Sequence, residues 1–171
     1  ESTRIDRAPD LTSAQKAAYH AREGCRLSPS SGDAWGTLAL VRHRGGEVMS
    51  AVAAARQAIA LGSGEWRHDI RLAYVSWGEE RLAAAHRALA RCHGLALAHG
   101  FAATVYVARQ MPDRAVAELS AGCAAQDPHH GRPSAFAAVG LHLLRGLVLA
   151  ARGDVDDALA EFARELAGMP R

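Results

Sequence analysis

Residues 153–162, with the sequence GDVDDALAEF, show the unit from which this chain is built: a glycine turn, acidic residues that open a helix, then a small and an aromatic residue. A turn that leads to an alanine on the following helix occurs three more times, before Ala51, Ala83 and Ala115. These alanines are spaced 32 residues apart, and Ala17 lies 34 residues before the first of them. A period in the thirties made of paired helices is typical of a helical solenoid, in which each pair packs on the next.

The composition agrees with a folded, helical chain. Of its 171 residues, 49% are hydrophobic and 22% are charged, which is inconsistent with an intrinsically disordered protein. Aromatic residues make up only 5%, and alanine, the best helix former, supplies much of the apolar total. β-Branched runs with period-two alternation are absent. The sequence therefore predicts an all-α fold.

Charge and hydropathy argue against nucleic-acid and membrane partners. The net charge of +2 comes from basic residues scattered among acidic ones, without a basic stripe. The longest apolar stretch, residues 135–151, contains His142 and Arg145, so we expect no membrane-spanning helix.

The cysteines are informative about the cellular compartment, and the first residue is informative about the extent of the chain. Cys25, Cys92 and Cys123 are widely spaced and odd in number, which favours reduced thiols and a cytoplasmic location over a disulfide framework. The chain begins with Glu1 and shows no signal-type apolar segment, so we expect a piece of a longer protein.

Capping and turn signals divide the chain into segments. Thr12 and Gln15 form a capping box before the first helix, and Ser134 is expected to cap a long helix that runs to Arg152. We predict a ragged N-terminal segment at residues 1–12 and a solenoid of about seven helices at 13–171. The parts of this solenoid are a leading helix B at 13–29, repeats at 31–62, 64–94 and 96–127, a loop at 128–133 and a last repeat at 134–170.

The repeat positions resemble a known pattern. Trp35, Leu38 and Ala39 occupy one helix, and Ala51 and Ala58 the next. In the last unit the corresponding small, alanine, aromatic and proline positions hold Gly146, Ala158, Phe162 and Pro170. These residues resemble helices A and B of the tetratricopeptide repeat family. The resemblance implies a right-handed solenoid of helical hairpins.

The chain departs from the 34-residue pattern of that family in several places. The middle units are spaced at 32, and Ala115 and Ala158 lie 43 residues apart. The turn near Met111 lacks a glycine, and Arg71 stands where a small residue is expected.

No motif predicts catalysis or a cofactor. His86 and His93 lie seven residues apart with Cys92 beside them, but neither the tight histidine pairing of a helical zinc motif nor a Cys-x-x-Cys occurs. The adjacent carboxylates Glu79 and Glu80 point about 100° apart on a helix, so they form no acid–base pair. We therefore expect no metal site, no cofactor and no enzymatic activity.

The family resemblance implies a concave groove, lined by the A helices, that takes a partner peptide. The implied groove residues are Leu40, His43, Arg44, His68, Leu72, Ser76, Thr104, Ala108, Leu143, Leu147 and Ala151. The Lys, Asn and Arg with which co-chaperone members hold a C-terminal carboxylate are missing at these positions. Its last part is apolar and suits an amphipathic helix or an extended apolar peptide.

The hypothesis from sequence is a non-catalytic protein–protein interaction scaffold that binds a partner protein or peptide in this groove. The alternative is a regulatory or docking segment of a larger enzyme or signalling protein. Self-association stays open, because truncated solenoids expose apolar faces, and so does coverage of the groove by other parts of a longer protein or by a second copy.

Overall fold

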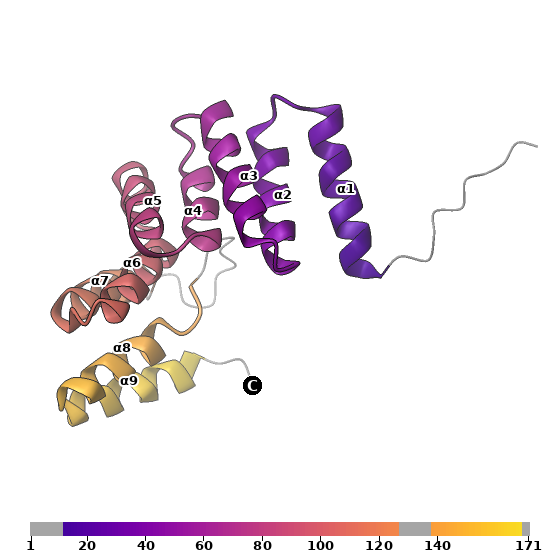
Figure 1. Cartoon of the computed structure of the whole chain (residues 1–171). Helices are drawn as coiled ribbons and strands as arrows, with labels where there is room; N and C mark the ends of the chain where they lie inside the picture. Colours follow the sequence, from indigo (N-terminus) through magenta and orange to yellow (C-terminus); the bar gives the residue numbers. More distant parts are fainter. Residues whose placement is uncertain (1–11, 127–137, 169–171) are drawn as a thin grey trace, which may run out of the picture. The chain divides into compact units, whose positions relative to one another are not determined.

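The structure is a computed structural model that describes residues 12–126 and 138–168 (Figure 1). These residues form nine α-helices and no strand, which confirms the all-α prediction, although about seven helices were expected. The helices are α1 Ser13–Leu27, α2 Gly32–Arg44, α3 Val48–Leu61, α4 Trp66–Val75, α5 Gly78–Arg91, α6 Ala96–Ala108, α7 Pro112–Gln126, α8 Leu141–Arg152 and α9 Val155–Gly168.

The chain divides into two compact units between Ser63 and Gly64. The first unit contains the hairpin of α2 and α3, with α1 packed on α2. The second contains three hairpins, α4 with α5, α6 with α7 and α8 with α9. Within this unit the hairpins stack through α5 on α6 and through α7 on α8. Each hairpin pairs two consecutive helices, and each stack joins one hairpin to the next.

Small residues lie where the two helices of a hairpin approach most closely. Ala51, Ala58 and Ala115 are completely buried, as the repeat pattern predicts. On α8, Gly146 faces Phe162 of α9, and a Cβ atom added to Gly146 would lie 2.4 Å from the Phe162 Cε1 atom. The ring therefore occupies the space that a larger side chain at this position would need.

The capping box that the sequence predicts is observed, and two other helix starts have favourable residues. The Thr12 hydroxyl accepts a hydrogen bond from the Gln15 N–H, and the Gln15 side chain accepts one from the Thr12 N–H, which completes the capping box. Ser31 accepts from the N–H of Ala34 and caps α2. Pro112 is the first residue of α7, a position that needs no N–H donor.

Three of the turns between paired helices contain a residue in the left-handed region. Gly46 and Gly153 have φ values of 81° and 91°, and in the turn without glycine Gln110 adopts 56°. In each turn the next N–H donates back to a carbonyl five residues earlier, for example Met111 to Tyr106. Gln110 thus adopts the left-handed conformation that a glycine adopts in the other two turns.

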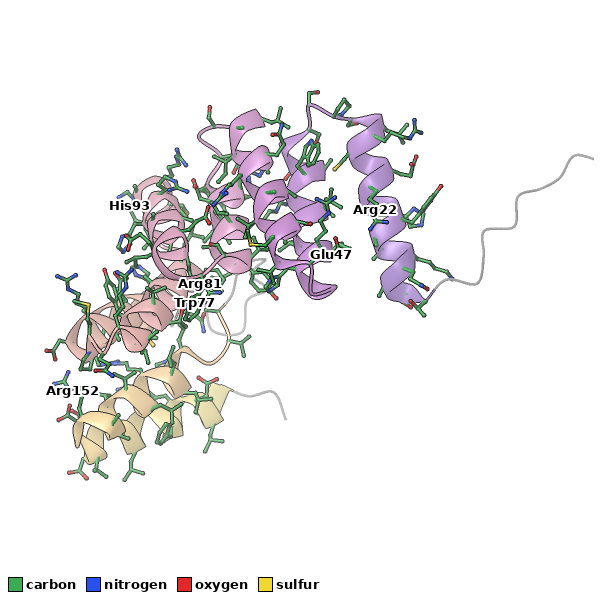
Figure 2. The ribbon with its side chains drawn as sticks, in the orientation of Figure 1. Arg22, Glu47, Trp77, Arg81, His93 and Arg152 are labelled. Atoms are coloured by element: carbon green, nitrogen blue, oxygen red, sulfur yellow. The ribbon has the colours of Figure 1, made fainter. Side chains whose placement is uncertain are left out.

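The turn between α4 and α5 is stabilised by a side chain. Arg81 donates from Nε to the carbonyl oxygens of Ala73 and Ser76, at 3.0 and 2.9 Å. Its guanidinium also lies 4.2 Å from the centre of the Trp77 ring (Figure 2). Burial lowers the pKa of Arg81 below its usual value. The guanidinium satisfies carbonyl groups that the last turn of α4 would otherwise leave to water.

The expected helix at 134–152 is wrong at its beginning. Residues 134–137 and the loop at 128–133 lie outside the described residues, and α8 begins only at Leu141. Gly140, with a φ of 79°, precedes it, and residues 138–140 are not helical. The expected roles of residues 1–11 and of Pro170 also lie outside the described residues.

Candidate functional site

The predicted groove residues of the first unit lie on α2. Leu40 and His43 are half-buried and Arg44 is exposed. The end of α2 in this unit is therefore polar and carries the cationic Arg44.

The predicted groove residues of α4 are buried. His68, Leu72 and Ser76 keep only 3–5% of their surface exposed. The Ser76 hydroxyl donates to the carbonyl oxygen of Leu72 at 2.6 Å, and the His68 Nδ1 atom lies 3.3 Å from Arg71. The surface of the predicted groove in the second unit therefore comes from α6 and α8.

On these two helices the predicted residues are more accessible. Thr104 is half-buried and donates to the carbonyl oxygen of Phe101, whereas Ala108 is exposed. Leu143 and Leu147 on α8 are 45% and 53% exposed, and Ala151 is exposed as well. Large aliphatic side chains that remain open to water on one helix are candidates for contact with a partner.

An apolar pocket of about 540 Å³ lies between the C-terminal halves of α6 and α8 and the start of α7. It is lined by Val107, Gln110, Pro112, Leu144, Leu147, Val148, Ala151 and Arg152. Of the predicted groove residues, Leu147 and Ala151 belong to it, whereas Thr104, Ala108 and Leu143 are not among the lining residues.

The other lining residues were missed by sequence reasoning. Leu144 and Val148 are spaced like one face of a helix together with Leu147 and Ala151, so a helical projection of 141–152 would have found them. Val107 lies next to the predicted Ala108 on α6, and Gln110 lies in the turn that follows this helix.

Arg152 supplies the charge at the edge of the pocket (Figure 2). Its guanidinium makes ion pairs with Asp113 at 2.9 Å and with Asp154 at 3.0 Å. The first of these pairs joins the end of α8 to the start of α7. The pocket therefore combines an aliphatic interior with a polar rim, as ligand sites commonly do.

A second polar cluster joins α5, α6 and α7. Glu118 lies 2.7 Å from the Nδ1 atom of His99 and 3.4 Å from the Nε2 atom of His86. The hydrogen bond to His99 holds the pKa of Glu118 below its usual value, against the opposing effect of burial. These groups tie neighbouring helices together.

The sequence also predicts reduced thiols and no membrane-spanning helix. The described residues contain no disulfide, and burial raises the pKa of the Cys25 thiol, against the opposing charge of Arg42, which makes it a poor nucleophile. Among the described helices none is long and apolar enough to span a bilayer.

One group of described side chains has the composition of a metal site, which the sequence did not predict. Cys123, His142 and Glu161 are buried and come from α7, α8 and α9. They lie 19 residues apart in sequence, so no short spacing motif connects them.

The sequence matches no protein-family model and no curated protein. Its fold resembles that of TTC0263, a TPR protein of Thermus thermophilus, with a TM-score of 0.73 and 18% identity over 92% of this chain and 84% of that one. PilF of Pseudomonas aeruginosa gives a TM-score of 0.77 at 16% identity over 92% and 70% of the two chains.

A third structure, YrrB, is described as a TPR protein with an unusual peptide-binding site. It gives a TM-score of 0.65 at 17% identity over 92% of this chain and 78% of that one. At these identities the similarity concerns the fold. The chain has the fold of tetratricopeptide-repeat proteins.

Proposed function

We propose that this protein is a non-catalytic interaction scaffold that holds an apolar segment of a partner protein in the pocket between α6 and α8. The observation that carries this proposal is the pocket itself, about 540 Å³ in volume and lined mainly by aliphatic side chains.

The exposed side chains make the pocket suitable for a hydrophobic anchor. Val107 is 40% exposed and Leu147 is 53% exposed, so a partner side chain that enters would remove water from both. Fully burying one leucine-sized side chain contributes about 1.5–3 kcal/mol to binding. An amphipathic helix or an extended apolar segment can present such anchors at regular spacing.

The rim limits which segments fit. Arg152 is engaged by two carboxylates, and Gln110 offers an amide that both donates and accepts hydrogen bonds. A partner with apolar anchors and uncharged polar flanks therefore matches the surface better than an acidic peptide does. The peptide-binding description of YrrB supports a peptide role by analogy of fold.

The test compares two exposed leucines of the second unit. Leu147→Glu places a charge in the pocket, and Leu159→Glu places the same charge on α9, where the leucine is 60% exposed and outside the pocket lining. A peptide-display library is selected on the wild-type chain, and the affinity of selected peptides for each variant is measured by fluorescence anisotropy.

We expect selected peptides to carry spaced apolar residues. Leu147→Glu should weaken them about tenfold or more, because it buries a charge against an apolar anchor. Leu159→Glu should leave their affinity unchanged. Equal loss in both variants, or full binding to Leu147→Glu with unchanged helicity, would sink the pocket as the binding site.

A further inference from the structure

Three metal-ligating side chains meet in the interior of the second unit. Cys123 of α7 is 3% exposed, His142 of α8 is 5% exposed and Glu161 of α9 is 3% exposed. One ligand atom from each, namely Sγ, Nδ1 and a carboxylate oxygen, lies within 4.8 Å of the others. Three consecutive helices thus each contribute one ligand atom.

The distances are near those of a tetrahedral zinc site. Sγ of Cys123 lies 3.6 Å from Nδ1 of His142, and usual Zn–S and Zn–N bond lengths at a tetrahedral angle put these atoms about 3.6 Å apart. Nδ1 lies 2.6 Å from Oε2 of Glu161, where the bond lengths require about 3.3 Å. The carboxylate oxygen would have to withdraw by about 0.7 Å.

The arginines beside the cluster hold the other carboxylate oxygen. Oε1 of Glu161 accepts from Arg145 at 3.2 Å and from Arg164 at 2.7 Å. Oε2 therefore faces the imidazole and the thiol. Both guanidinium groups thus contact Oε1, and Oε2 is the oxygen next to Nδ1.

The positive charge of these arginines opposes a cation, and the protons of the ligands offset that opposition. A thiol ligates a metal as the thiolate, so the thiol proton leaves when the ion binds, and the thiolate offsets one of the two charges of the ion. Nδ1 ligates through its lone pair, so a proton on Nδ1 has to leave or move to Nε2.

We propose that Cys123 Sγ, His142 Nδ1 and Glu161 Oε2 bind Zn²⁺, with water as the fourth ligand. Thiolate and imidazole favour zinc over magnesium or calcium, which take oxygen ligands. Because the ligands come from α7, α8 and α9, the ion fastens the last hairpin to the one before it. The proposal is independent of the peptide pocket, which shares none of these residues.

The first test adds Co²⁺ and then Zn²⁺ to the purified chain after treatment with a chelator. A thiolate ligand gives Co²⁺ a sulfur-to-metal charge-transfer band in the near ultraviolet. We expect this band to saturate at one equivalent and to disappear when Zn²⁺ is added. A spectrum without the band overturns the proposal, because no thiolate then ligates the ion.

The variants assign the band to one thiol. Cys25→Ser with Cys92→Ser leaves Cys123 as the single cysteine of the chain and should keep the band and the one-to-one ratio. Cys123→Ser should remove the band and weaken Zn²⁺ about tenfold or more in competition with a chromogenic chelator. A band lost from the double variant while its helicity is unchanged would overturn the proposal, whether or not Cys123→Ser folds.

Thermal unfolding gives a second readout. Zn²⁺ should raise the Tm of the wild-type chain and of the double variant but not that of Glu161→Gln, since a ligand that binds only the folded state stabilises it. An equal rise of Tm in Glu161→Gln would show that the ion binds elsewhere.

Discussion

Two carboxylates of the second unit are buried inside helix pairs, and their surroundings differ. Asp69 of α4 is 1% exposed and is paired with Arg87 and Arg91 of α5. Glu161 of α9 is 3% exposed and also has two arginine partners, but His142 of α8 lies against its second oxygen.

The comparison shows which partners a buried carboxylate requires and which partners are additional. A buried carboxylate needs compensating charge and hydrogen-bond donors, and the two arginines of the α4–α5 pair meet that need at Asp69. At Glu161 two arginines are present as well, and the imidazole and the Cys123 thiol come in addition. Charge compensation explains the first site, whereas the extra ligand groups at the second distinguish it as the zinc candidate.

The largest expected effect comes from removing the compensation at Asp69. Arg87→Met with Arg91→Met leaves the carboxylate buried without its cations, and we expect a loss of about 3–5 kcal/mol in the free energy of unfolding. Urea unfolding followed by circular dichroism measures the change. The cost arises at Asp69, because the arginine side chains themselves are about 40% exposed and would hydrate when released.

Arg67→Met is the matched control. Arg67 pairs with Glu65 at 3.0 Å, but both side chains are largely exposed, so the expected loss is about 0–1 kcal/mol. A double variant that loses no more than this control would mean that water reaches Asp69. Asp69 and Glu161 could then no longer be compared as two carboxylates that are both shielded from water.

The sequence predicted small residues at the packing positions of the helix pairs. Ala51, Ala58 and Ala115 are buried as expected, and Gly146 faces Phe162 as the repeat pattern requires. Turn residues and small residues report local geometry, because only they tolerate a left-handed turn or a close approach of helices. The fold was therefore predictable to a few residues at most helix ends.

The beginning of α8 and the buried clusters were not predictable. Gly140 lies inside an apolar stretch. In such a stretch the sequence alone does not distinguish a glycine within a helix from a glycine that ends one. The stacking of three helices brings Cys123, His142 and Glu161 together. The spacing of residues within a single helix does not indicate a contact of this kind. The contribution of Val107, Gln110 and Pro112 to the pocket was hidden for the same reason.

A smaller effect comes from overpacking next to Glu161. Gly146→Val forces the Phe162 ring, which follows Glu161 in sequence, away from α8, and we expect a cost of about 1–3 kcal/mol. His142 lies one turn before Gly146 on α8, so the same shift should separate it from Glu161 and weaken Zn²⁺ binding. Urea unfolding and chelator competition measure the two effects.

Ala150→Val, on an exposed position of the same helix, serves as the control for the β-branched side chain. It should cost less than Gly146→Val and leave Zn²⁺ affinity unchanged. If the two valine variants were equally stable, the contact between Gly146 and Phe162 would not determine how α8 and α9 pack.

The smallest effect concerns a third carboxylate, Glu118, which has histidine partners and no arginine. The hydrogen bond to His99 holds its pKa below the ordinary value, so it stabilises the folded state above the unfolded pKa. That contribution is lost as the pH falls through the lowered folded pKa. Glu118→Gln should therefore flatten the acid side of the stability profile, measured by urea unfolding between about pH 3 and 6, where carboxyl groups titrate. Glu79→Gln, at a side chain that is 77% exposed, should leave the slope as it is. An unchanged slope in Glu118→Gln would mean that the histidines do not favour the ionised carboxylate. Arginine, and not histidine, would then be the partner that stabilises a buried carboxylate in this fold.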